Sequence, residues 1–307
     1  MADSGPTTLY FAGVNDAGGT VTPHLIRVTD DLDKSLSQQF VKQADDFLKD
    51  DYELVDYQPK VNYRLEREQV FVIRQLDLPD PYVEAAKKPQ QAPDFAPSVR
   101  PLPMISTVYA AEMSGAKPSR FLFQQFRSTQ LLVNRMSIIF ASGTFSQLRN
   151  EGLSLSNELV AIYQAKTLYF RSFPIVSRFI DLPDYEPEAS DTEISEFLGS
   201  ALFDLEDVGE TFTIIEGDAW LRRRVASIQG NKILSRVKPR TAANKAKPFG
   251  ITIDVSRPDG TDKIRLPQEK APLKKVVKFL NEEFYHGELT RTMYETNSHQ
   301  PHKVKKK

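Results

Sequence analysis

The residues best suited to chemistry in this sequence are cations gathered in one segment. Residues 219–247 contain nine basic side chains and no Asp or Glu. The nine are Arg222, Arg223, Arg224, Lys232, Arg236, Lys238, Arg240, Lys245 and Lys247. Like charges one helical turn apart repel, so a basic run of this length is usually interleaved with acidic residues. An anion is therefore expected to lie against the segment: the chain's own acidic block, a neighbouring subunit or a nucleic-acid backbone.

A second basic patch lies on the last helix that the sequence predicts. It consists of Lys274, Lys275 and Lys278, and Glu282 follows Lys278 at a spacing that can neutralise part of its charge. Together with the nine cations above, these lysines form the expected DNA-binding set. Few aromatic residues are interleaved with the set, so contacts with the phosphate backbone are expected and base stacking is not.

The chain carries no residue pattern typical of an enzyme. It has no Cys, which excludes thiolate nucleophiles, disulfides and Cys-ligated zinc, and its four His lack metal-ligand spacing. No Lys has Asp or Glu two positions before it, as a restriction-type nuclease site requires, and the serine motif GxSxG is absent. We therefore expect no catalytic residues, no metal and no cofactor.

The segment Gly13–Thr20 has the outline of a phosphate-binding loop. Gly19, however, occupies the position of the lysine that would reach the phosphates, and no helix-forming run follows. A hairpin turn between two strands is the better interpretation.

The formal net charge of −1 hides four blocks of opposite sign. Residues 1–98 carry a net charge of −7, residues 99–180 +6, residues 181–218 −13 and residues 219–307 +13. This asymmetry indicates an acidic surface and a basic surface, and hence a charged partner. The acidic block, residues 181–218, lacks the ligand spacing of a calcium loop and is expected to form a solvated helical face.

The elements that must position these residues indicate an α/β protein of the α+β type. A helix is predicted from Asp30 to Leu48, and β-rich runs between residues 119 and 171 predict an antiparallel meander. Seven prolines within residues 79–103 predict an extended linker. We therefore expect mixed or antiparallel sheets with packed helices in two domains, an N-terminal domain (1–98) that ends in this proline-rich linker and a C-terminal domain (104–307).

Two local patterns bear directly on the cations. Asp218 is predicted to cap a helix whose apolar residues face the core, so Arg222–Arg224 should project from the opposite side. The apolar residues of this helix are Leu221, Val225 and Ile228. Pro239 and Pro248 bracket a segment that is expected to be a mobile loop able to follow a phosphate chain.

A compact pattern of elements occupies the C-terminal part of the chain. From Leu273 to Thr290, and again from Tyr294 to Ser298, a helix leads into an Asn-acidic-acidic segment, a Glu-Leu-Thr turn and a Tyr-containing strand. Earlier pieces agree in order: Met136–Phe145, Leu168–Phe170, Phe173–Phe179 and Asp218–Ile228. In these features residues 120–298 resemble the KwaB-like proteins of the Kiwa anti-phage defence system. The chain departs from that pattern at Gly287 and His299, where serine and lysine are expected.

The resemblance implies a non-enzymatic anti-phage defence effector. KwaB-like proteins bind double-stranded DNA without sequence specificity, interfere with phage DNA replication or late transcription, and act with the membrane protein KwaA. The expected partners are thus phage double-stranded DNA, a KwaA-like membrane protein and a second copy of the chain in a homodimer. Because the sequence shows neither a signal peptide nor a membrane-spanning run, we expect a cytoplasmic protein that its partner recruits to the inner face of the membrane.

Two other functions stay open at this point. An adaptor subunit could use its acidic block (181–218) and basic segment (219–247) for oligomerisation, and would then ignore DNA. A metal-dependent nuclease of an unfamiliar type would cleave DNA when a divalent metal is added.

Overall fold

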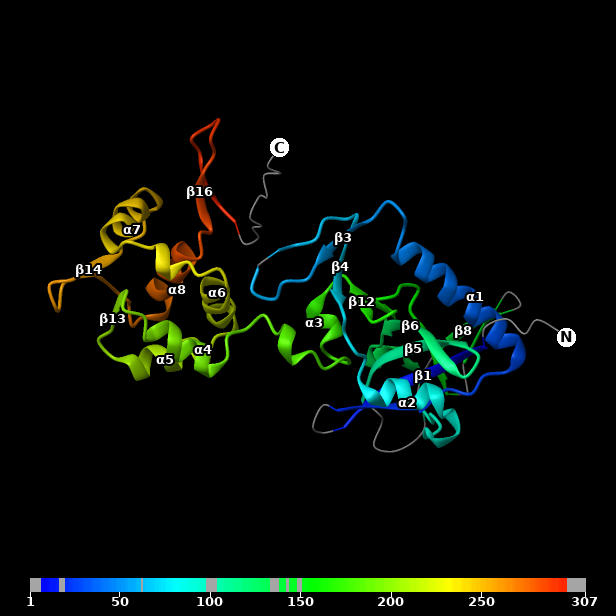
Figure 1. The fold of residues 1–307 in the computed structure, drawn as a ribbon. Helices are drawn as coiled ribbons and strands as arrows, with labels where there is room; N and C mark the ends of the chain where they lie inside the picture. Colours follow the sequence, from blue (N-terminus) through cyan, green and yellow to red (C-terminus); the bar gives the residue numbers. More distant parts are fainter. Residues whose placement is uncertain are drawn as a thin grey trace. The chain divides into compact units, whose positions relative to one another are not determined.

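The chain folds into two compact units, each built from segments that are not contiguous in sequence. The computed structural model describes residues 7–16, 20–61, 63–97, 104–132, 138–141, 144–147 and 151–296. Unit 1 comprises Met1–Tyr57 and Leu65–Leu182, and unit 2 comprises Gln58–Arg64 and Pro183–Lys307 (Figure 1). The α/β class with mixed and antiparallel sheets and packed helices is confirmed.

Unit 1 is organised around an eight-stranded sheet of order β2-β1-β5-β6-β11-β12-β4-β3. Its strands are β1 (Thr7–Asn15), β2 (Val21–Leu25), β3 (Glu53–Asp56), β4 (Gln69–Arg74), β5 (Met104–Ser114), β6 (Lys117–Gln125), β11 (Ala161–Gln164) and β12 (Thr167–Phe170). All neighbours are antiparallel except β3 and β4, which are parallel. The meander that the sequence predicts after residue 119 is therefore the centre of a larger sheet. Smaller elements beside it are η2 (Ser128–Gln130) and the pairs β7 (Leu131–Leu132) with β10 (Gly152–Leu153) and β8 (Ile138–Ala141) with β9 (Thr144–Gln147).

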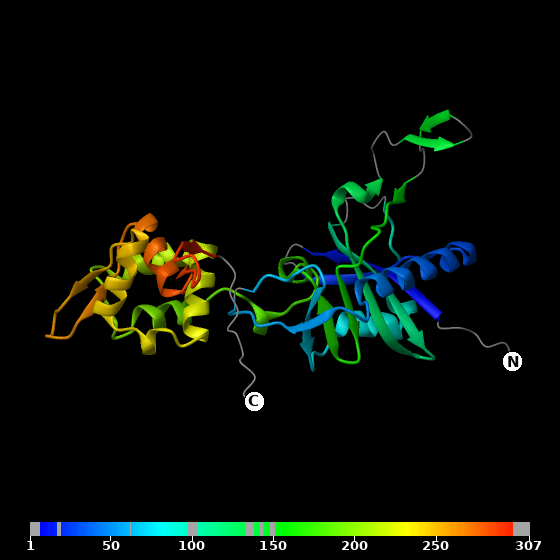
Figure 2. The same cartoon turned by 90° about the horizontal axis from the view of Figure 1, so that it is seen from above.

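Helices cover both faces of this sheet. The long helix α1 (Asp30–Phe47) packs Phe40 and Ala44 against one face, in a buried cluster with Tyr10 and Leu122 (Figure 2). Alternate residues of the same strands point to the other face, where Tyr109 and its neighbours meet α2 (Asp80–Lys87) and α3 (Phe173–Val176). This alternation of apolar side chains is what makes the sheet the middle layer of unit 1.

The boundary between the units lies elsewhere than the proline-rich segment suggested. The strands β1 and β4, before that segment, pair directly with β5 and β12, which follow it. The expected division at residues 98–104 therefore cuts through a single sheet, and the division between units falls after Leu182. Prolines show where the chain cannot make regular backbone hydrogen bonds, but they do not show where a domain ends. The pairing of strands that are distant in sequence leaves no pattern in the local sequence.

The proline-rich segment is also less extended than expected. Pro79 and Pro81 begin α2, where a missing amide hydrogen costs nothing, and Pro89 begins η1 (Pro89–Gln91). The ring of Tyr82 is buried against Tyr109, with a centroid distance of 5.2 Å. Residues 98–103 of the segment lie outside the described residues.

Unit 2 is mainly helical. Its helices are η3 (Pro183–Tyr185), α4 (Asp191–Leu198), α5 (Val208–Glu216), α6 (Ala219–Gly230), η4 (Leu234–Arg236), α7 (Pro239–Ala246), η5 (Lys247–Phe249) and α8 (Lys270–Leu280). Its strands form a three-stranded sheet of order β13 (Phe203–Asp204), β15 (Lys263–Arg265), β14 (Asp254–Ser256), and a hairpin of β16 (Phe284–His286) and β17 (Met293–Glu295). A single cluster of buried side chains from the helices and the small sheet forms the core.

Local signals in the sequence explain how the unit 2 helices begin. Ser190 and Glu193 form a reciprocal capping box at α4, and the Asp207 carboxylate accepts the amide of Glu210 at α5. Asp218 caps α6 as predicted, since its carboxylate accepts the amides of Trp220 and Leu221. No helix of the described residues is long and apolar enough to cross a bilayer.

Candidate nucleic-acid interface

The twelve cations of the expected DNA-binding set fall into three groups in the structure. One lies in the core, four are tied to carboxylates of the same chain, and seven are exposed. The exposed seven, hereafter the exposed cations, are Arg223, Lys232, Arg236, Lys238, Lys245, Lys247 and Lys275.

Arg224 is a core residue, and the prediction that it projects away from the core is wrong. Only 8% of Arg224 is exposed. Its Nε lies 3.0 Å from Oε1 of Glu283, which is fully buried, and its guanidinium lies 3.7 Å from the ring centre of Trp220. α6 packs against α4, α5 and α8, so more than one side of the helix is enclosed. The helical spacing already placed residue 224 one turn from residues 221 and 228, which is a signal the sequence offered.

The four tied cations hold unit 2 together at its charged surface. Arg222 donates its Nε–H to the carbonyl oxygen of Ala189 at 2.9 Å, and its Nη2 lies 3.3 Å from Asp191. The anion that the sequence predicted beside the basic segment is thus, for Arg222, the chain's own acidic block. Arg240 lies 2.6 Å from Asp262 but remains largely exposed, so solvent and salt weaken this pair.

Lys274 and Lys278 of α8 are committed to buried carboxylates. Lys274 and Lys270 both contact Oδ2 of Asp218, at 2.7 Å and 2.8 Å. Burial alone would raise the pKa of the Asp218 carboxyl, but hydrogen bonds from Lys270, Lys274 and the Leu221 amide outweigh it and hold that pKa well below its usual range. Lys278 pairs with Glu295 and lies 4.0 Å from Glu283.

The exposed cations have a different surrounding. Within the residues that the structure describes, no carboxylate oxygen lies within 4.0 Å of a charged nitrogen of these seven side chains. Six of the seven belong to the segment from α6 to η5, and Lys275 lies on α8. Each of these seven cations is therefore open to an anion from outside the chain.

α7 carries one of these cations, Lys245, and has Lys238 and Lys247 at its two ends, so the expectation of a mobile loop between Pro239 and Pro248 is wrong. Pro239 stands at the first helical position, and Ala242 and Ala246 are buried against the unit 2 core. The helix therefore fixes Lys245, and η5 fixes Lys247, on the solvent side. Two prolines that suggested a break act here as a helix start and as part of the following short helix.

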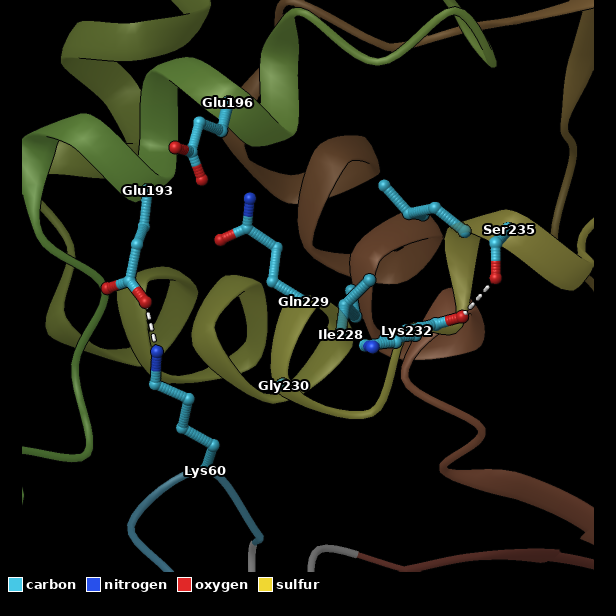
Figure 3. A pocket seen from close by; sticks show the side chains of 9 residues that line it. Lys60, Glu193, Glu196, Ile228, Gln229, Gly230, Lys232 and Ser235 are labelled. Carbon is cyan, nitrogen blue, oxygen red and sulfur yellow. Dashed lines mark hydrogen bonds and ion pairs between the residues drawn. The ribbon is translucent and has the colours of Figure 1, made fainter.

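A pocket of about 390 Å³ lies beside α4 and the end of α6 (Figure 3). Lys60, from the short segment of unit 2 that precedes β4, pairs there with Glu193, and Glu196 and Lys232 also line the wall. Gly230 permits this approach, because a Cβ at that position would lie 2.8 Å from Cβ of Lys60. The pocket thus carries charges of both signs, and Lys232 of the exposed cations lines it together with two carboxylates. No sequence pattern singled out Lys60.

The other chemical patterns of the sequence take structural roles. β1 and β2 pair antiparallel, with Asn15 opposite Val21, so Gly13 lies within β1, the connection between the strands follows Asn15, and the hairpin interpretation is confirmed. Asn281 and Glu283 of the Asn-acidic-acidic segment are fully buried, and the Asn281 side chain donates to Glu283 at 2.7 Å. In the described part of the chain, no three His, Cys, Asp or Glu side chains gather as a metal site would require.

Compared with known proteins, the chain shows no significant match to a family model, to a curated protein or to a solved structure.

Proposed function

We propose that the protein binds the phosphate backbone of double-stranded DNA without sequence preference, through the exposed cations of unit 2. The observation that carries this proposal is that seven cations stay exposed and without a carboxylate partner among the described residues, while their neighbours Arg222, Arg224 and Lys274 are paired. A fold that neutralises some of its cations and presents the rest keeps a positive field at its surface. Phosphates are the natural anions for such a surface, because binding releases their condensed counterions.

The resemblance to KwaB-like proteins supplies the biological setting of the proposal. In that setting the chain is an anti-phage defence effector that interferes with phage DNA replication or late transcription and acts with a KwaA-like membrane protein. A homodimer and recruitment to the inner face of the membrane belong to the same proposal. What supports it is that a helix capped by Asp218, the hairpin of β14 and β15 and the helix α8 follow one another from Asp218 to Thr290, although α7 stands between the first helix and the hairpin.

The test is a gel-shift titration of a linear duplex at two salt concentrations. Arg223→Glu, Lys238→Glu and Lys245→Glu combined should weaken binding to all duplex sequences by a similar factor. Each lost phosphate contact should also remove about 0.9 from the slope of log affinity against log salt. A matched control reverses three exposed lysines of unit 1, Lys34→Glu, Lys42→Glu and Lys117→Glu. Equal affinity and slope in both triple variants would contradict the proposal.

A second candidate function is that of an adaptor that pairs copies of itself. The acidic block also keeps exposed carboxylates without an ion pair among the described residues, including Glu196, Glu206 and Glu210. Acidic and basic surfaces on one chain could join copies head to tail. Light scattering across ionic strength separates the two functions, because the adaptor gives a salt-sensitive oligomer that duplex DNA leaves unchanged. Incubation of plasmid with the protein and Mg²⁺ or Mn²⁺ tests the nuclease alternative in the same preparation.

A further inference from the structure

The hairpin of β16 and β17 extends away from the helices of unit 2 (Figure 1), and it concentrates exposed apolar side chains. Leu289, in its turn, is 99% exposed, and three further large apolar residues on the hairpin are also exposed. These three are Tyr285, Met293 and Tyr294. Such a group on a soluble protein marks an interaction site.

The hairpin is held firmly enough to present its turn in one orientation. At its base, the amide of Thr296 donates to the carbonyl oxygen of Glu283 at 2.9 Å, and Lys278 pairs with Glu295. In the turn, the amide of Gly287 donates to Thr292 at 2.9 Å and that of Arg291 donates to Gly287 at 2.8 Å. An isolated two-stranded hairpin is marginal in water, so these anchors are what keep Leu289 in place.

The two faces of the hairpin differ. Phe284 and His286 pack on Phe249, with ring-centre distances of 5.4 Å and 5.0 Å. On the other face the rings of Tyr285 and Tyr294 stack at 5.3 Å. Gly287 makes room for that pair, since a Cβ there would lie 2.8 Å from the Tyr294 ring.

Exposed cations flank the base of the hairpin on two sides. Phe249, which packs on β16, ends the short helix that begins with Lys247. Lys278, which pairs with β17, lies one turn from Lys275 on α8. The hairpin therefore rises from a basic surround, which suits a polyanion.

We infer that Leu289 is a wedge that enters the minor groove and separates a base step of duplex DNA. Some DNA-binding proteins place β-ribbons in the minor groove, and apolar side chains that enter from there unstack a base step and kink the duplex while nearby cations hold the backbone. Within the turn, residues 287–292, Leu289 is the one large apolar side chain, and it is followed by Thr290 and Arg291. Tyr285, Met293 and Tyr294 lie on the strands and not in the turn, so the tip offers one apolar side chain to a base step, whereas insertion into a bilayer takes several at the same level. The inference rests on the proposed DNA binding and adds deformation of the duplex to it.

The test measures DNA bending and affinity together. A 25-base-pair duplex with donor and acceptor dyes at its ends should give a higher transfer efficiency when the full-length protein binds. Leu289→Ala should abolish most of that increase and weaken affinity by about tenfold, the effect of losing one buried leucine side chain. The slope of log affinity against log salt should not change, because no phosphate contact is lost. Glu288→Gln should tighten binding, since the carboxylate next to the wedge opposes the phosphates.

Controls separate the possible failures. Leu32→Ala, which removes an exposed leucine of α1 in unit 1, should leave bending and affinity unchanged. Binding with unchanged bending in Leu289→Ala overturns the wedge and leaves the proposed function standing, whereas no binding by the unaltered protein overturns both. Two further assays test other partners of the tip: flotation with phosphatidylglycerol vesicles for lipid, and light scattering for a dimer. If Leu289→Ala abolishes flotation or dimer formation but leaves DNA bending unchanged, the tip binds lipid or a second copy, and the wedge is overturned.

Discussion

At the scale of single residues, adjacent arginines of α6 have opposite roles. Arg223 is exposed, whereas Arg224 is enclosed between Trp220 and the buried carboxylate of Glu283. The sequence predicted the Asp218 cap and the apolar face of α6 correctly, because both depend on spacing within one helix. The helical spacing also put Arg224 on the side of Leu221 and Ile228, but it could not show the buried carboxylate that holds this arginine, since Glu283 lies more than fifty residues further along the chain.

Arg224→Ala should destabilise the protein strongly, because it leaves the Glu283 charge buried without its partner. The expected loss in free energy of unfolding is about 3–5 kcal/mol. Arg223→Ala, the matched control, should change it by less than about 0.5 kcal/mol. Urea denaturation measures both, and similar midpoints for the two variants would contradict the burial of Arg224.

Asp218 should make stability depend on pH at the acidic end. Its pKa in the folded protein lies below that of the unfolded chain, so the stabilisation is fully present above about pH 4 and is lost as the pH falls through the lower, folded value. Asp218→Asn keeps a residue able to cap α6 but removes the charge that Lys270 and Lys274 contact. The variant should be less stable than the unaltered protein by about 1–2 kcal/mol at pH 7. When the pH falls from 4 to 2, the free energy of unfolding should decrease less in the variant than in the unaltered protein. Parallel pH profiles for the two proteins would contradict this assignment.

At the scale of elements, helices with a clear apolar stripe were predictable and irregular ones were not. The stripe of α8 and the hairpin around Gly260, whose φ is +77°, follow directly from residue spacing and turn chemistry. α7 is only eight residues long and is buried through two alanines, which are too small to show as an apolar face in sequence. The Glu-Leu-Thr turn between β16 and β17 was expected, but the exposure of Leu289 was not, because a leucine looks the same in sequence whether buried or exposed.

Gly230→Ala tests how the segment 58–64 is held against α6. Alanine favours a helix over glycine by up to about 1 kcal/mol, so a purely local effect would be stabilising. The new methyl group would instead collide with Lys60 and should displace its side chain from Glu193. Hydrogen exchange would then show faster exchange of the backbone amides in residues 58–61. Gly209→Ala, where the added Cβ meets only an ordinary contact of 3.4 Å, is the control. Unchanged exchange in Gly230→Ala would contradict the close approach.

At the scale of the whole molecule, the charge blocks of the sequence do not coincide with the folded units. Unit 1 has a net charge of −4 and unit 2 of +3, because unit 2 combines the acidic block with the basic segment. Much of the acidic block's charge is thus carried by the unit that also presents the exposed cations. The sequence could not show this, since the strand pairings that define unit 1 connect residues about a hundred positions apart.

The partial pairing sets an upper limit on the salt dependence of DNA binding. Seven phosphate contacts, one for each exposed cation, correspond to a slope of about −6 in log affinity against log salt, and the twelve first expected would give about −11. Titrations between 50 and 200 mM salt distinguish these values. A slope near −11 would show that the ion pairs within the chain open when DNA binds, and it would contradict the view that only the seven exposed cations contact phosphates.

The two-part composition of unit 2 has a consequence for how the protein is made. Lys60 is synthesised well before Gly230, against which it packs because glycine has no Cβ. At 5–20 residues per second, the delay between the two residues is about 10 to 30 seconds. During that interval the strands of unit 1 can assemble around the loop while its lysine has nothing to dock on. Synthesis therefore favours an order in which the first unit folds with residues 58–64 still undocked and the second is completed on them.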